Sequence, residues 1–140
     1  MEDPDRKFTY VEMKFFTMWY EMQNNQTKAD VHQLVREGRL EFVNGGWSMH
    51  DEACPHYEDM INNMWQGHKF LKKEFGVKPR IGWHVDPFGH SSANPRLFAD
   101  MGFEAWFFAR LDFADKDKRK ADESMNFLWR PFSKHFGNEK

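Results

Sequence analysis

The segment between Arg80 and Arg110 constrains the fold more than any other part of the sequence. It contains a short apolar run that ends in an aspartate, "RIGWHVD" (80–86), and a second apolar run, "EAWFFAR" (104–110). The stretch between them, "NPRLFADMGF" (94–103), has a proline near its start and a glycine near its end, which is typical of a short helix. A strand, a helix and a strand in this order predict parallel pairing. The nearly continuous apolar character of 104–110 further predicts a strand buried on both faces.

The N-terminal half repeats this alternation. Helical spacing of six apolar side chains predicts a core-facing helix over 7–23, and these are Phe8, Val11, Phe15, Met18, Trp19 and Met22. A second short helix through Val31 and Val35 should end at Gly38, and "RLEFV" (39–43) should form a strand.

A longer helix is expected between Pro55 and Gly76. Its predicted apolar stripe consists of Tyr57, Met60, Ile61, Met64, Leu71 and Phe75, and His68 on the same stripe is interpreted as structural. The charged segment 112–123 should be solvated, and "NFLWRPF" (126–132) could begin another strand. Together these elements predict an α/β fold with parallel strands.

Composition excludes several classes of protein. The 140 residues suffice for one modest domain, and the 15 Phe and 6 Trp are ample for a core. The 20 basic and 22 acidic residues are mixed along the chain, which argues against a nucleic-acid partner. Cys54 is the only cysteine, so an internal disulfide and a cysteine-rich zinc site are excluded. No apolar run approaches the length of a membrane span, and the acidic start "MEDPDRK" is not a signal peptide.

Candidate chemistry gathers where the strands end. Functional groups of parallel sheets collect beyond the carboxyl ends of the strands, where Asp86, Arg110 and the segment 44–47 would lie. His84 and Asp86 are two apart on a strand and should point the same way, as zinc ligands could, with His90 folding back over them. A buried Arg110 beside Asp86 would favour the ionised carboxylate. The alternative is structural: Asp86 caps the turn after Pro87, and His84 packs against Trp83.

Three stretches resemble a known family. They are "NGGWSMHDEACPHYEDMI", "FLKKEFGVKPRIGWHVDPFGHSSANPRLFADMGFEAWFFARLDFADK" and "FLWRPF". They closely resemble the N-terminal catalytic domain of glycoside hydrolase family 38, from Lys7 to about Phe132, and "GWHVDPFGHS" is specific for that family. The resemblance implies that residues 1–140 are part of an irregular parallel β/α barrel.

The resemblance also implies an activity. The family's enzymes are retaining exo-α-mannosidases that bind zinc, so terminal α-D-mannose of N-glycan-type oligosaccharides is the expected substrate. The lysosome or another secretory-pathway compartment is the expected location. The family's nucleophile, which is also a zinc ligand, falls on Asp86. Phe88 would line the substrate pocket and Arg110 would orient carboxylates and sugar hydroxyls. The ligand role considered for His84 loses ground, and His90 becomes a supporting or structural residue.

The departures from the family pattern set a limit on this expectation. No His-x-Asp pair precedes Phe8, although the family takes two zinc ligands from one. The resemblance puts a further histidine ligand and the general acid beyond residue 140. The chain is therefore expected to be a fragment of the catalytic domain that is inactive alone and holds zinc weakly or not at all.

Three alternatives remain. A degenerate mannosidase could persist as a non-catalytic mannose-binding or interaction remnant. A metal-dependent deacetylase-like hydrolase would need a His-x-x-x-His pair, and the sequence has none. A pseudogene product without a stable fold is the third possibility.

Overall fold

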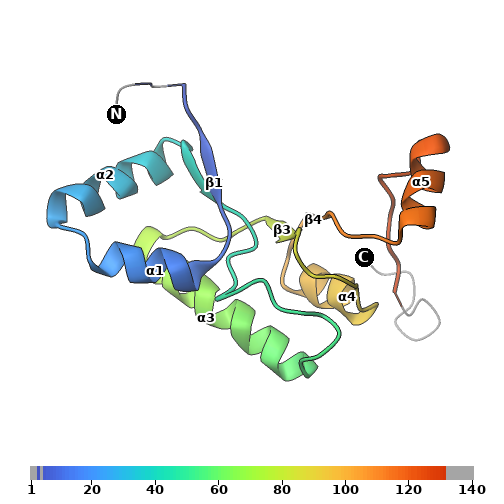
Figure 1. Ribbon diagram of the computed structural model, residues 1–140. Helices are drawn as coiled ribbons and strands as arrows, with labels where there is room; N and C mark the ends of the chain where they lie inside the picture. Colours follow the sequence, from blue (N-terminus) through green and yellow to red (C-terminus); the bar gives the residue numbers. More distant parts are fainter. Residues whose placement is uncertain (1–2, 4, 132–140) are drawn as a thin grey trace.

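A computed structural model describes residue 3 and residues 5–131 of the chain. Figure 1 shows its helices and strands alternating along the sequence, with α5 standing apart from the rest. The elements in order are β1 (Phe8–Tyr10), α1 (Met13–Glu21), α2 (Asn25–Arg36), β2 (Leu40–Phe42), α3 (Tyr57–Phe75), β3 (Ile81–His84), α4 (Ala93–Asp100), β4 (Ala105–Phe108) and α5 (Phe113–Ala121).

The strands form two parallel pairs. β1 pairs with β2 and β3 pairs with β4, so the predicted parallel α/β arrangement is confirmed. Asn44, just after β2, joins the two pairs: its N–H donates to the Ile81 carbonyl at 2.6 Å, and its Oδ1 accepts from the Trp83 N–H at 3.2 Å. Two pairs of three- and four-residue strands do not close a barrel within the described residues, so the barrel stays a prediction.

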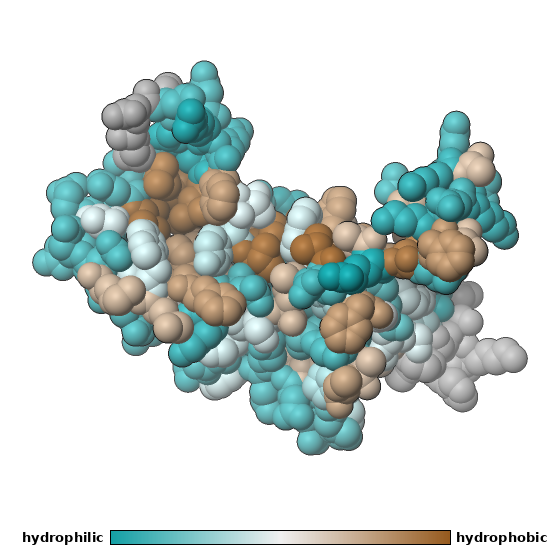
Figure 2. All heavy atoms as spheres, viewed as in Figure 1, coloured by the Kyte–Doolittle hydropathy of each residue, from teal (hydrophilic) through white to brown (hydrophobic). Residues whose placement is uncertain are grey.

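The N-terminal helix differs from its prediction. Residues 8–10 form a strand, and α1 buries Met13, Phe16, Thr17 and Tyr20 instead of the expected stripe. Phe15 is 59% exposed whereas Phe16 is 4% exposed. The predicted face was wrong because apolar side chains surround this helix, and spacing alone cannot choose between two faces. Figure 2 shows apolar side chains gathered around β1 and α1.

Helix α3 follows its prediction more closely. It ends at Gly76, whose φ of 70° lies in the left-handed region that favours glycine. Met60, Met64 and Leu71 of the predicted stripe are buried, whereas Tyr57 and Ile61 are exposed. Gly67 lies against the loop after β2, because a Cβ there would stand 1.9 Å from the Gly45 carbonyl oxygen. This close approach fixes the loop 43–56 on the helix.

The C-terminal part differs from its prediction at β4 and at residues 126–131, whereas the charged segment is solvated as expected. β4 is not buried on both faces, since its residues alternate between exposed and half-buried. The charged segment forms α5, which begins at the Asp112 cap and buries none of its residues. Residues 126–131 form no strand, and Phe132 lies outside the described residues. No helix among the described residues is long and apolar enough to cross a membrane.

Candidate active site

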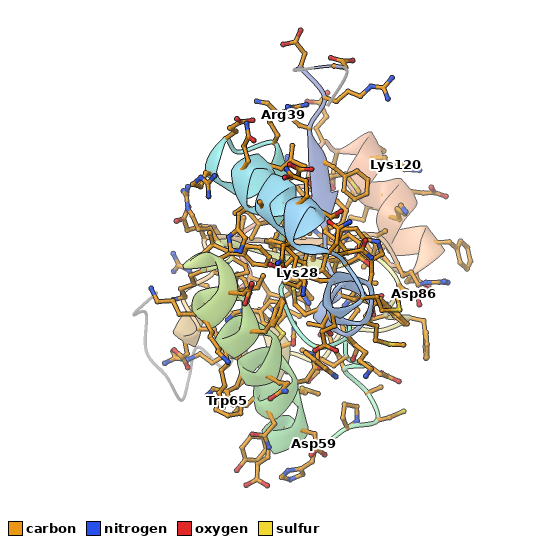
Figure 3. The ribbon with its side chains drawn as sticks, turned by 90° about the vertical axis from the view of Figure 1, so that its left-hand side faces the viewer. Lys28, Arg39, Asp59, Trp65, Asp86 and Lys120 are labelled. Atoms are coloured by element: carbon orange, nitrogen blue, oxygen red, sulfur yellow. The ribbon has the colours of Figure 1, made fainter. Side chains whose placement is uncertain are left out.

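Asp86 and Arg110 meet at the carboxyl ends of β3 and β4. Asp86 lies in a bend two residues after β3, and Arg110 follows β4 by two residues. The Arg110 Nη2 donates to Asp86 Oδ1 at 3.0 Å. The Asp86 side chain is 71% exposed and that of Arg110 is 56% exposed. Figure 3 places Asp86 at the edge of the molecule, well away from Asp59 and Trp65 of α3.

This geometry confirms that the two loops converge but corrects the expected environment. Arg110 is not a buried cation, because the described residues leave this side of β4 open to solvent. An exposed pair of this kind is screened by water and contributes little to stability. The contact orients one carboxylate oxygen of Asp86 and leaves the carboxylate accessible to solvent.

Phe88 and Arg110 line one open pocket of about 960 Å³. Its remaining described walls come from Gly89 and His90, from the end of β4 and the loop after it, from α5 and from residues 127–130. Asp86 is not among the described residues that line it. The pocket therefore adjoins the Asp86–Arg110 pair through Arg110 and does not contain the carboxylate.

His84 and Asp86 do not share a face. His84 is fully buried and its ring lies against His50, Phe98 and Trp106, whereas Asp86 is in solvent. The predicted alternation fails because β3 ends at His84 and the chain bends before Asp86. The alternative contact of His84 with Trp83 is also not the one found, since Trp83 lies against Phe107 instead.

A buried carboxylate that sequence reasoning missed, Glu52, lies against this loop. Its side chain has no exposed surface and accepts three hydrogen bonds. His84 Nδ1 lies 3.0 Å and His90 Nδ1 lies 2.7 Å from Oε2, and the Ser91 N–H donates to Oε1 at 3.1 Å. No periodic pattern could reveal Glu52, because it belongs to the long irregular loop between β2 and α3.

A second buried group extends this network. His50 Nε2 lies 2.8 Å from Asn94 Oδ1, and its Nδ1 lies 3.5 Å from Asn63 Nδ2. Burial lowers the pKa of His50 below its usual 6.5, and the Asn94 contact opposes that shift. Burial likewise lowers the pKa of His68, whose Nε2 lies 2.8 Å from the Asn44 carbonyl. His68 thus has the structural contact that was expected of it.

The expected zinc site can be compared with these positions. Among the described residues, no three or more His, Cys, Asp or Glu side chains are placed to hold a metal ion. His84 and His90 point their Nδ1 atoms at Glu52 instead. The expected third loop, 44–47, contributes structural contacts, such as the hydrogen bonds of Asn44 to β3. The part of the loop that reaches the site is Glu52.

Comparisons with known proteins agree on one family. Residues 1–135 match the glycosyl hydrolases family 38 N-terminal domain. The chain is 50% identical over 132 residues to lysosomal alpha-mannosidase of Bos taurus, covering 93% of this chain and 13% of that protein. It is 50% identical over 137 residues to an alpha-mannosidase of Canavalia ensiformis (97% and 14%), and 49% identical over 131 residues to a probable alpha-mannosidase of Arabidopsis thaliana (93% and 12%). The chain thus spans 12 to 14% of the length of these relatives.

Proposed function

We propose, from the premise that this chain belongs to glycosyl hydrolase family 38, that it supplies the nucleophile of a retaining α-mannosidase. The relatives named above are α-mannosidases, so terminal α-D-mannose of N-glycan-type oligosaccharides is the proposed substrate. Residues 1–140 would form one part of the N-terminal catalytic domain and of its β/α barrel. The relatives that are called lysosomal support a lysosomal location.

The contact that carries this proposal is the Asp86–Arg110 pair. Arg110 binds Oδ1 of Asp86, and among the described residues Oδ2 has no hydrogen-bond partner. Oδ2 can therefore attack the anomeric carbon, forming an ester bond to C1 while the glycosidic C1–O bond breaks. A second carboxylic acid must protonate the leaving oxygen, and then, as a base, help water to hydrolyse the ester. The family resemblance puts that acid beyond residue 140.

Phe88 and Arg110 are proposed to bind the sugar. The exposed ring of Phe88 can contact the apolar face of a mannose ring, and the guanidinium of Arg110 has further N–H groups for hydroxyls. Both side chains line the same pocket, which is wide enough for a monosaccharide.

Asp86 is proposed to be one zinc ligand as well. A bound zinc ion would hold sugar hydroxyls and favour the distorted ring that precedes cleavage. One carboxylate among the described residues is short of the three protein ligands that a catalytic zinc needs. We therefore propose that the other ligands come from elsewhere in the enzyme, and that the 140-residue chain alone is inactive.

A second candidate function rests on the position of the pocket. Because Asp86 does not line it, the pocket could bind a sugar without catalysis, as in a degenerate mannosidase. Calorimetric binding of methyl α-mannoside distinguishes the two, since the remnant would bind the sugar without zinc and after D86A.

The main test is the substitution D86N in the complete polypeptide that encloses this sequence. Loss of the nucleophile should lower kcat on an aryl α-mannoside at least about 1,000-fold. The matched control is D100N, which alters an exposed aspartate that is likewise paired with an arginine, Arg96. An activated 2-fluoro-mannoside should also label Asp86 covalently, as mass spectrometry of the digest would show. Full activity of D86N, or a label on another carboxylate, would overturn the proposal.

A further inference from the structure

Glu52 is the most deeply buried carboxylate that the proposed mechanism leaves without a role. Its side chain has no exposed surface, and each of its oxygens accepts at least one hydrogen bond. A buried carboxylate is unfavourable unless it is paired in this way, so its retention beneath the site needs an explanation.

The three donors to Glu52 lie on both sides of Asp86 in the chain. His84 precedes Asp86 by two residues, and His90 and Ser91 follow it by four and five. One carboxylate therefore closes the bend that carries Asp86. The bend itself holds Asp86 by one side-chain contact among the described residues, the hydrogen bond from Arg110.

His90 extends the same connection to Arg110. Its Nε2 donates to the Arg110 carbonyl at 2.8 Å while its Nδ1 faces Glu52 Oε2 at 2.7 Å. His90 therefore bridges the Glu52 carboxylate and the Arg110 backbone through its two ring nitrogens. These contacts connect Glu52 to Asp86 in three steps: Glu52 contacts His90, His90 contacts the Arg110 backbone, and the Arg110 side chain contacts Asp86.

We propose that Glu52 is a positioning residue, which sets the separation and orientation of Asp86 and Arg110 through His84, His90 and the Ser91 N–H. The inference rests on the proposed function, because it assigns to Asp86 the role of the nucleophile. Glu52 itself does not contact the sugar. It acts by holding both loops in register, and displacement of a reacting group by about 1 Å can lower a rate about 100-fold.

Two substitutions of Glu52 distinguish the effect of its side-chain length from the effect of its charge. E52Q keeps the length of the side chain: its amide nitrogen, in the place of Oε2, can donate to both Nδ1 atoms, and its oxygen can accept from Ser91. His84 can adopt the required tautomer because its Nε2 has no partner among the described residues. E52D keeps the charge but is one methylene shorter and cannot reach all three donors.

The experiment measures kcat and KM of the complete polypeptide carrying E52Q, E52D or E104Q, each normalised to its folded fraction by circular dichroism. Glu104 is the matched control, since it joins the same two strands through Arg80 at the end away from Asp86. We expect E52D to lower kcat about 100-fold with little change in KM, and E52Q to stay within about tenfold of the original protein. E104Q should match the original protein.

The outcomes separate this inference from the proposed function. If E52D matches the original protein while D86N is inactive, the positioning role is refuted and the nucleophile stands. If E52Q loses as much activity as E52D or more, the reach of the side chain does not suffice without its charge, which also refutes the inference. If D86N remains active, the proposed function fails and the positioning role fails with it.

Discussion

Two regions of the described chain, one around α1 and one around β3 and β4, are stabilised by different kinds of contact. The N-terminal region has an aromatic core in which Phe16 lies within 5.0 to 6.2 Å of the rings of Tyr10, Tyr20, Phe42, Phe70, Phe75 and Trp19. The region around β3 and β4 has aromatic contacts too, such as that of Phe98 with Trp106, but it adds a buried polar network built on Glu52, His84, His90, His50 and Asn94.

The difference has a physical consequence. Apolar contact depends on area and tolerates small shifts, whereas hydrogen bonds depend on distance and angle. A polar network therefore fixes the position of a loop more strictly than an apolar core of the same size, but it is costly when one partner is lost. The candidate active site lies over the polar network, where position matters most.

Substitution of Phe16 should give the largest loss of stability. F16A removes the ring at the centre of the aromatic core and should lower the free energy of unfolding by about 3–5 kcal/mol. The neighbouring substitution F15A, at an exposed ring, should cost within about 0.5 kcal/mol. Urea denaturation of both variants measures the contrast. Equal losses would contradict the burial of Phe16 and the exposure of Phe15.

A smaller loss is expected in the polar network. N94A removes the acceptor of the His50 Nε2–H and should lower the free energy of unfolding by about 1–3 kcal/mol, because a buried donor is left unpaired. N62A makes the same change at an exposed position on α3 and should be nearly neutral. A neutral N94A would show that the network does not stabilise the fold.

The last expected effect is the dependence of stability on pH. The pKa of His50 and that of His68 are lowered by burial, so the unfolded chain binds more protons than the folded chain below pH 6.5. The stability is therefore fully present above 6.5 and falls with falling pH, by at most about 1.4 kcal/mol per pH unit for each group.

Substitution of His50 tests this dependence. H50Q should flatten the decline in unfolding free energy between pH 7 and 5, whereas H56Q, at an exposed histidine, should leave it unchanged. Urea midpoints across this range measure the slope. If the dependence of the unfolding free energy on pH is unchanged in H50Q, groups other than His50 cause it.

The sequence predicted the positions of the helices and strands better than it predicted which of their side chains are buried. The strands around Leu40, Ile81 and Ala105 and the helix end at Gly76 follow from patterns that depend on near neighbours. The buried face of α1 was wrong because that helix carries apolar residues all round. The helix α5 was missed because a charged segment that buries none of its residues has no apolar period, although Asp112 is a cap of the expected type.

Some features of the candidate site could also be predicted from the sequence, and others could not. Asp86 and Arg110 could be paired from the sequence because parallel strands bring their carboxyl ends to one edge. The exposure of these two side chains could not be predicted, since solvent access depends on which elements cover β4.

By itself the sequence determined the alternation of strands and helices, the family and the placement of Asp86 after a strand, because each is written in short runs of neighbouring residues. Only the tertiary structure decided that Glu52 is buried beneath Asp86, since the two are 34 positions apart and no local pattern connects them. Partners of a buried charge are selected by the packing of distant segments, and that selection becomes visible only in the folded chain.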